Sequence, residues 1–167
     1  MPRHVNIPIF IPHLGCPNNC VFCNQKTISG HLSFDPSSVE REIEEALSTV
    51  SSEDECEIDR GLMIDLLDRA QKYIDSGRVS AIRLSTRPDY IDGEILSILS
   101  RYGVRTVELG LQSLSDQVLT ASGRGHNASQ AEKACRMVKE YGFELIGQMM
   151  IGLPMSDGEK EIETARK

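Results

Sequence analysis

Apolar positions along this chain change repeatedly between a period of two and a period near 3.6, which predicts alternating strands and helices. An apolar run from Ile7 to Ile11 predicts a first strand, and Asp35-Pro36 resembles a helix N-cap followed by proline. Asn127 with Gln130 predicts a capping box, and Gly103 and Gly142 are expected to end helices. The remaining pattern predicts strands at 79–85, 104–111 and 144–151, and helices at about 36–50, 62–76, 92–102, 128–141 and from 156 onward.

Strand and helix alternating at about 30 residues per unit predict an α/β fold with a parallel sheet and right-handed crossovers. No linker interrupts the pattern, so residues 1–167 are expected to form one domain. A closed eight-unit barrel takes about 250 residues, which exceeds this length. An open or partial (βα) barrel of about five units, or a small doubly wound sheet, fits the chain.

Composition narrows the class of protein further. The 167 residues are 40% hydrophobic and 26% charged, which excludes a disordered chain or a coiled coil, and the net charge of −7 argues against broad binding to phosphate backbones. We find no signal peptide and no membrane span, so a cytoplasmic protein without membrane contact is expected. Disulfides are rare in that compartment, so the five cysteines need another explanation.

Polar or small residues interrupt three of the predicted strands on one face, although strands of a parallel sheet are usually apolar on both. Each of these residues, taken alone, is also consistent with a satisfied buried group or a solvated strand end. Ligand sites in such folds gather at the carboxyl ends of the strands, so we expect a polar ligand there. The residues concerned are Arg83, Ser85, Arg87, Thr106, Glu108, Gly110, Gln112 and Gln148.

Three cysteines, Cys16, Cys20 and Cys23, follow the first predicted strand with the spacing C-x-x-x-C-x-x-C. Their thiolates can converge on one metal centre. A structural zinc would need a fourth ligand, for which His13 is close in sequence, whereas an iron–sulfur cluster suits the thiolates and is favoured by the spacing. Three ligands would leave one iron of a cubane open to a substrate or cofactor. Cys135 is interpreted as a small buried hydrophobic residue, and no other residue is an evident partner for the thiol of Cys56.

The cysteine segment, CPNNCVFCNQ, resembles the cluster loop of radical S-adenosylmethionine (radical SAM) enzymes, in which an aromatic residue such as Phe22 precedes the third cysteine. Other segments are similar to the radical domain of the Elongator catalytic subunit and its shorter bacterial relatives. These segments are IPIFIPHLGCP, RLSTRPDYI, VELGLQS, SGRGHN and QMMIGLP. The resemblance covers nearly the whole chain and implies a partial barrel of the radical SAM type.

The resemblance implies a 4Fe–4S cluster held by Cys16, Cys20 and Cys23, with S-adenosylmethionine on the fourth iron. An external electron donor would reduce the cluster, and cleavage of the cofactor to a 5′-deoxyadenosyl radical would allow hydrogen abstraction. In the family the substrate associated with Elongator relatives is a transfer-RNA wobble uridine, for which the acidic balance here gives no support. The cofactor contacts implied are Phe22, Glu108, Gln112, Arg124 and Gln148.

Two of these assignments have simpler alternatives, and so does a role for His126, which lies close to Arg124 in the sequence. Arg124, whose fork suits the methionyl carboxylate, could be a solvated charge in a Gly-Arg-Gly turn. Glu108 could form an internal ion pair with one of three arginines, Arg83, Arg87 or Arg105. The neighbouring His126 could only help to start the following helix.

The chain departs from the family pattern at two places. The glycine-rich end of the second strand is absent, since only Ser51 to Arg60 lie between two helices, and no sixth strand follows the fifth. A missing inner strand would leave edges unpaired, so either reduced stability or association with another chain to complete the barrel is expected. The alternatives to an active enzyme are a catalytically impaired iron–sulfur or zinc-binding α/β module, or a structural fragment that needs a partner chain.

Overall fold

Five parallel strands form one sheet in the computed structural model, which describes residues 5–8, 20–23, 37–47, 54–57 and 63–167. The strands follow each other across the sheet in sequence order, each paired with the next. This arrangement confirms the α/β class and the parallel sheet. The strands are β1 (Val5–Pro8), β2 (Asp54–Glu57), β3 (Val79–Thr86), β4 (Val104–Gln112) and β5 (Glu144–Met149).

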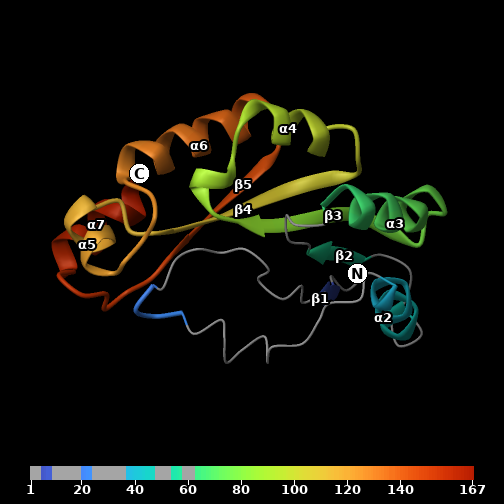
Figure 1. Ribbon diagram of the computed structural model, residues 1–167, viewed down its shortest axis with the longest axis horizontal. Coiled ribbons are helices and arrows are strands. Elements are labelled where there is room, and N and C mark those ends of the chain that lie inside the picture. Colours follow the sequence, from blue (N-terminus) through green and yellow to red (C-terminus); the bar gives the residue numbers. More distant parts are fainter. Residues whose placement is uncertain (1–4, 9–19, 24–36, 48–53, 58–62) are drawn as a thin grey trace.

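Helices connect the strands, and α3, α4 and α6 lie along one face of the sheet (Figure 1). At the end where β4 and β5 terminate, α5 and α7 lie beside each other (Figure 1). In the described part of the chain, no helix has the length and apolar character that crossing a membrane requires. The helices are α2 (Ser38–Leu47), α3 (Met63–Asp75), the short 3₁₀ helix η2 (Pro88–Tyr90), α4 (Gly93–Leu99), α5 (Asp116–Ala121), α6 (Ala128–Glu140) and α7 (Gly158–Arg166).

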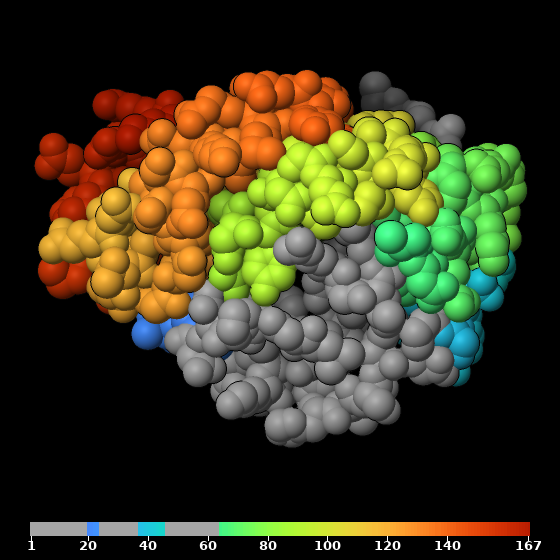
Figure 2. Space-filling model, turned by 45° about the horizontal axis from the view of Figure 1, so that its top comes forward, coloured from blue at the N-terminus to red at the C-terminus, as the bar shows by residue number. Residues whose placement is uncertain are grey.

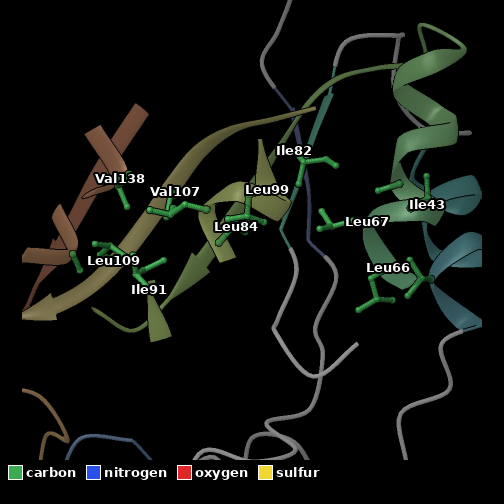
Figure 3. Close-up of a cluster of buried hydrophobic side chains, with 14 residues drawn as sticks. Ile43, Leu66, Leu67, Ile82, Leu84, Ile91, Leu99, Val107, Leu109 and Val138 are labelled. Carbon is green, nitrogen blue, oxygen red and sulfur yellow. The ribbon is translucent and has the colours of Figure 1, made fainter. Parts of the chain in front are cut away.

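The hydrophobic core lies between one face of the sheet and helices α2, α3, α4 and α6. On β3 and β4, alternate residues point into it because successive side chains of a strand face opposite ways. Figure 3 shows this cluster, to which β3 and β4 contribute Ile82, Leu84, Val107 and Leu109, α2 and α3 contribute Ile43, Leu66 and Leu67, and α4 and α6 contribute Leu99 and Val138. The core therefore fixes which face of β3 and β4 remains for polar groups.

The second strand corrects one expectation from the sequence. The inner strand is not missing: β2 pairs with β1 from Val5↔Asp54 to Pro8↔Glu57 and with β3 from Asp54↔Val79 to Cys56↔Ile82. Four residues are enough for this strand to pair with a neighbour on each side. Because the strand contains few apolar residues, the hydrophobic pattern of the sequence does not predict it. The residues that follow it, 58–62, lie outside the described part of the chain, as do Asp35-Pro36 and Ile9 to Ile11 of the first predicted strand.

The sequence predicts most of the helix ends correctly from their capping residues. The capping box is confirmed, because Asn127 accepts from the Gln130 N–H while the Gln130 side chain accepts from the Asn127 N–H. Gly77 and Gly142 both have positive φ, 71° and 87°, which glycine adopts without steric cost. Two short elements were not predicted, η2 and α5, because each is too short to show a helical period.

Gly103 has a different role from the helix end expected for it. Helix α4 ends at Leu99 with Ser100 as a right-handed cap, and Gly103 has no positive φ. A β-carbon at position 103 would lie 2.3 Å from Cδ1 of Ile74, and the Gly103 N–H donates to the Gln71 side chain at 2.8 Å. The glycine is therefore needed for the close approach of α3 to the start of β4.

Substituting Gly103→Ala is expected to lower the free energy of unfolding by about 1–2 kcal/mol, because the new methyl group displaces Ile74. Urea denaturation measures the change. In an Ile74→Val background, which removes the clashing methyl group, the same substitution should cost less. Gly158→Ala is the matched control, since nothing lies within 4 Å of its β-carbon position. Equal effects at positions 103 and 158 would contradict the steric explanation.

Candidate functional site

Polar residues line the face of β4 opposite the core, as the strand pattern predicted. Thr106, Glu108 and Gln112 are all buried, at 4%, 6% and 7% exposure. Thr106 donates to the Glu144 carboxylate at 2.9 Å, and Glu108 forms an ion pair with Arg83 from β3. One buried strand face is thus occupied by hydrogen-bonding groups, which is where this fold places a ligand.

Gln112 ends β4 in an unusual backbone conformation. Its φ is +64°, a left-handed value that is uncommon and unfavourable for residues other than glycine. Its carbonyl accepts from the Met150 N–H at 2.9 Å, which ties the end of β4 to the segment after β5. The side-chain oxygen of Gln112 is buried and has no hydrogen-bond partner among the residues described. A buried acceptor in a strained residue is a candidate ligand contact.

The cysteine segment lies against the turn that follows α5. Cys20 is 7% exposed, and the Cys23 N–H donates to the Cys20 carbonyl at 3.0 Å, which folds the two cysteines into one turn. The Val21 N–H donates to the Ser122 carbonyl at 3.1 Å, and the Cys20 thiol donates to the Gly123 carbonyl at 3.6 Å. Figure 2 shows residues 20–23, in blue, beside the atoms of this turn.

Two of the three predicted metal ligands are therefore held at the carboxyl edge of the sheet. Cys23 is partly exposed, and neither Cys20 nor Cys23 forms a disulfide. The third cysteine, Cys16, and the candidate zinc ligand His13 lie outside the described residues, as does the side chain of Cys56. Cys135 packs half-buried against the core, which agrees with its prediction as a small hydrophobe.

Arg124 joins the cysteine segment to β4. Its Nη1 atom lies 3.8 Å from Sγ of Cys20, Nη2 donates to the Gly110 carbonyl, and its Cζ atom lies 5.8 Å from the centre of the Phe22 ring. A β-carbon on Gly110 would lie only 3.3 Å from Nη2, so glycine permits this approach. Arg124 is thus a partly buried member of the site and not a solvated loop charge.

Glu108 and Gln148, two further predicted cofactor contacts, have other surroundings than Arg124. Glu108 is paired with Arg83, which is one of the ion pairs that its sequence allowed, and Ser85 is its neighbour in register on β3. Gln148 is exposed on β5 and is aligned with Gly110 of β4. The structure brings Phe22 and Arg124 into contact with each other, with Gln112 beside them at Gly110.

His126 is fully buried, and Asn127 caps the helix that follows it. Its Nδ1 atom lies 3.8 Å from Oδ1 of Asp89, and Asp89 also accepts from Arg87 at 3.0 and 2.6 Å. Burial and the nearby Arg124 guanidinium lower the pKa of His126 to about 4, while Asp89 opposes the shift. The imidazole is therefore neutral at pH 7.

Sequence reasoning missed Asp89 and the carbonyls of Ser122 and Gly123 as parts of this region. The segment S-T-R-P-D entered the sequence analysis only as part of the family resemblance. Its arginine and its carboxylate, two residues apart, could have indicated an ion pair next to the site. Backbone carbonyls carry no sequence signal at all. The site combines soft sulfur donors, a fixed cation and a buried amide acceptor, which suits a metal centre with a charged polar ligand beside it.

Comparison with protein families and relatives gives a consistent picture. The model of the radical SAM superfamily matches residues 10–166. The tRNA uridine(34) acetyltransferase of Methanocaldococcus jannaschii is 31% identical over 103 residues, which is 60% of this chain and 19% of that protein. Elongator complex protein 3 of Schizosaccharomyces pombe is 30% identical over 104 residues, 61% of this chain and 19% of its own length. The chain thus spans about a fifth of these relatives.

Solved structures share the fold. Elp3 from Methanocaldococcus infernus superposes with a TM-score of 0.70 at 19% identity, over 98% of this chain and 41% of that one. The coproporphyrinogen III oxidase of Escherichia coli, described as a radical SAM enzyme, gives a TM-score of 0.65 at 18% identity over 98% of this chain and 40% of its own. At these identities the likeness concerns the fold, and it agrees with the partial barrel predicted.

Proposed function

Since this chain belongs to the radical SAM superfamily of enzymes, we propose that it binds a 4Fe–4S cluster through Cys16, Cys20 and Cys23, and S-adenosylmethionine beside it. When bound, the cluster supplies the electron for reductive cleavage of S-adenosylmethionine, the chemistry for which the superfamily is named. An external one-electron donor would reduce it. The observation that carries the proposal is the position of Cys20, buried at the carboxyl edge of the sheet with the Arg124 guanidinium 3.8 Å from its sulfur.

The donor set fits such a cluster. Thiolates are the ligands that iron–sulfur clusters use, and a cation beside a thiolate offsets part of the negative charge that accumulates there. The turn from Cys20 to Cys23 brings two of the sulfur-bearing residues together before metal arrives. Cys20 is 7% exposed, and this burial limits access of water to its sulfur, which is a protein contribution to cluster stability.

The residues beside the cysteines fit the second cofactor. Gln112 offers a buried oxygen that can accept from an amine or hydroxyl, and Arg124 offers a positive charge and a buried Nε–H, without a partner among the described residues, to a carboxylate. Phe22 presents an aromatic ring next to them, while Gln148 is accessible on β5. Glu108 contributes indirectly in this proposal, by holding Arg83 on the polar face of the sheet.

We test this proposal by anaerobic reconstitution of the chain with iron and sulfide. The expected product is a brown protein with about four irons per chain, which releases 5′-deoxyadenosine from S-adenosylmethionine after reduction with dithionite. A chain that retains zinc and takes up no iron would instead be a zinc-binding module. A chain with an intact cluster that leaves S-adenosylmethionine unchanged would be a catalytically impaired module. The reason for considering this outcome is that the chain lacks the glycine-rich segment expected at the end of the second strand.

For the substrate we propose RNA, because one of the relatives described above, the Methanocaldococcus jannaschii protein, is named for the acetylation of a transfer-RNA uridine. The net charge of −7 makes broad electrostatic attraction to RNA weak, so binding would depend on a local surface or on other parts of the protein. Transfer RNA added to the reconstituted chain should raise 5′-deoxyadenosine formation several-fold. Equal formation with and without RNA would contradict an RNA substrate while leaving the cofactor assignment intact.

A further inference from the structure

The guanidinium of Arg124 has a contact that cofactor binding alone does not explain. Its Nη1 atom points at the sulfur of Cys20, 3.8 Å away, within the range of a hydrogen bond to sulfur. The nitrogen on the other arm, Nη2, donates to the Gly110 carbonyl, and the Phe22 ring lies 5.8 Å from Cζ. The charge is therefore aimed at one particular cysteine sulfur and is held there from two other directions.

The position of this guanidinium is built into the turn that carries it. The Arg124 N–H donates to the Leu119 carbonyl at 2.9 Å, and Gly123 has a φ of +71°, which lets the chain reverse after α5. The Ser122 carbonyl of the same turn accepts from the Val21 N–H at 3.1 Å, so the backbones of the turn and of the cysteine segment are joined whether or not Cys20 carries a proton. Arg124 cannot move away from Cys20 without breaking contacts on both sides.

We propose that Arg124 donates a hydrogen bond to the Cys20 thiolate of the bound 4Fe–4S cluster and thereby raises the reduction potential of that cluster. This inference rests on the cluster assignment made above. Reduction adds one electron, supplied by an external donor, and makes the cluster and its thiolates more negative. A fixed positive charge and a hydrogen bond at a ligating sulfur stabilise that reduced form more than the oxidised form.

The geometry separates this role from binding of S-adenosylmethionine. The contact to Cys20 uses the Nη1 arm and is present in the protein alone, so its effect on the potential must appear before the cofactor is added. A residue that acted only on the cofactor carboxylate would leave the potential of the cofactor-free cluster unchanged. A measurement without S-adenosylmethionine therefore reports the sulfur contact by itself.

The test is an anaerobic redox titration of the reconstituted chain without S-adenosylmethionine, followed by electron paramagnetic resonance of the reduced cluster. In Arg124→Gln, which removes the charge, the ratio of reduced to oxidised cluster at a given potential should fall at least tenfold, equivalent to about 59 mV for one electron. Arg124→Lys keeps a charge but loses the planar fork, so a smaller shift in the same direction is expected. Arg136→Gln is the matched control, because it removes the same charge from an exposed position on α6.

Iron content is measured in parallel, so that loss of the cluster is not mistaken for a change in potential. If Arg124→Gln takes up no cluster, Arg124→Lys is titrated in its place. A reduction potential of the Arg124→Lys cluster equal to that of the unsubstituted chain then overturns the inference. The inference is also overturned if the cluster of Arg124→Gln has the same reduction potential as that of the unsubstituted chain, or if its potential changes no more than that of Arg136→Gln. Failure of the unsubstituted chain to bind any cluster would instead refute the proposed function.

Discussion

Replacing Cys20 by alanine is expected to abolish the cluster, reducing iron from about four per chain to below one after reconstitution. Cys20 is the more buried of the two cysteine ligands that the structure describes, at 7% exposure, and the Arg124 guanidinium lies 3.8 Å from its sulfur. With only three cysteines in the loop, removing one leaves too few thiolates to hold a cubane. Release of 5′-deoxyadenosine should fall to background. Iron analysis and the visible spectrum measure the loss.

Cys135→Ala provides the matched control for this experiment. Cys135 lies half-buried on α6 against the core, and burial raises the pKa of its thiol, so it remains protonated and unavailable to metal. This variant should bind as much iron as the unsubstituted chain. Circular dichroism of both variants checks that each is folded. Iron binding by Cys20→Ala equal to that of the control would refute the proposed ligand set.

A second large effect is expected in the pH dependence of stability, through His126. The pKa of this residue is about 4 in the folded chain, against 6.5 in the unfolded chain, because burial and Arg124 disfavour the protonated ring. Between these two values the unfolded chain binds the proton and the folded chain does not. Acidification from pH 7 to pH 4 should therefore remove about 3 kcal/mol of the free energy of unfolding, and raising the pH should restore it.

The groups that face His126 define what else titrates near it. They are Asp89 and Arg87 from the segment after β3, and Arg124 from its own turn. In His126→Gln, urea denaturation should show a pH dependence that is weaker by about the same 3 kcal/mol. If this variant does not fold, the histidine signals in proton NMR of the unsubstituted chain give the pKa directly. A value near 6.5 for His126 would contradict burial as the cause.

Secondary structure was largely readable from the sequence because its signals are local. The apolar period located β3, β4, α3 and α6, and the pairing of Asn127 with Gln130 located the start of α6 within one residue. The strand β2 was missed, since a four-residue strand with three acidic side chains carries little apolar signal, and its existence depends on the neighbours that pair with it. Gly103 was misread because Ile74, which requires it, is remote in sequence.

For the candidate site, the sequence supplied the chemistry of the side chains and the spacing of the cysteines. It also determined that polar residues occupy one face of β4, since alternation along a strand is a local property. It could not determine which of these residues meet. Cys20 and Arg124 are 104 residues apart, and Glu108 could have paired with any of three arginines until the register of β3 and β4 selected Arg83.

The sequence by itself therefore determined the order of the strands and helices other than β2, η2 and α5, the family resemblance, and a set of soft ligands placed after the first strand. The tertiary structure decided that Arg124 faces a cysteine sulfur, that Gln112 is buried with a free acceptor among the described residues, and that His126 is neutral. These properties follow from burial and from contacts between distant segments. Both depend on how the chain packs, because desolvation and Coulomb interactions act through space and not along the sequence.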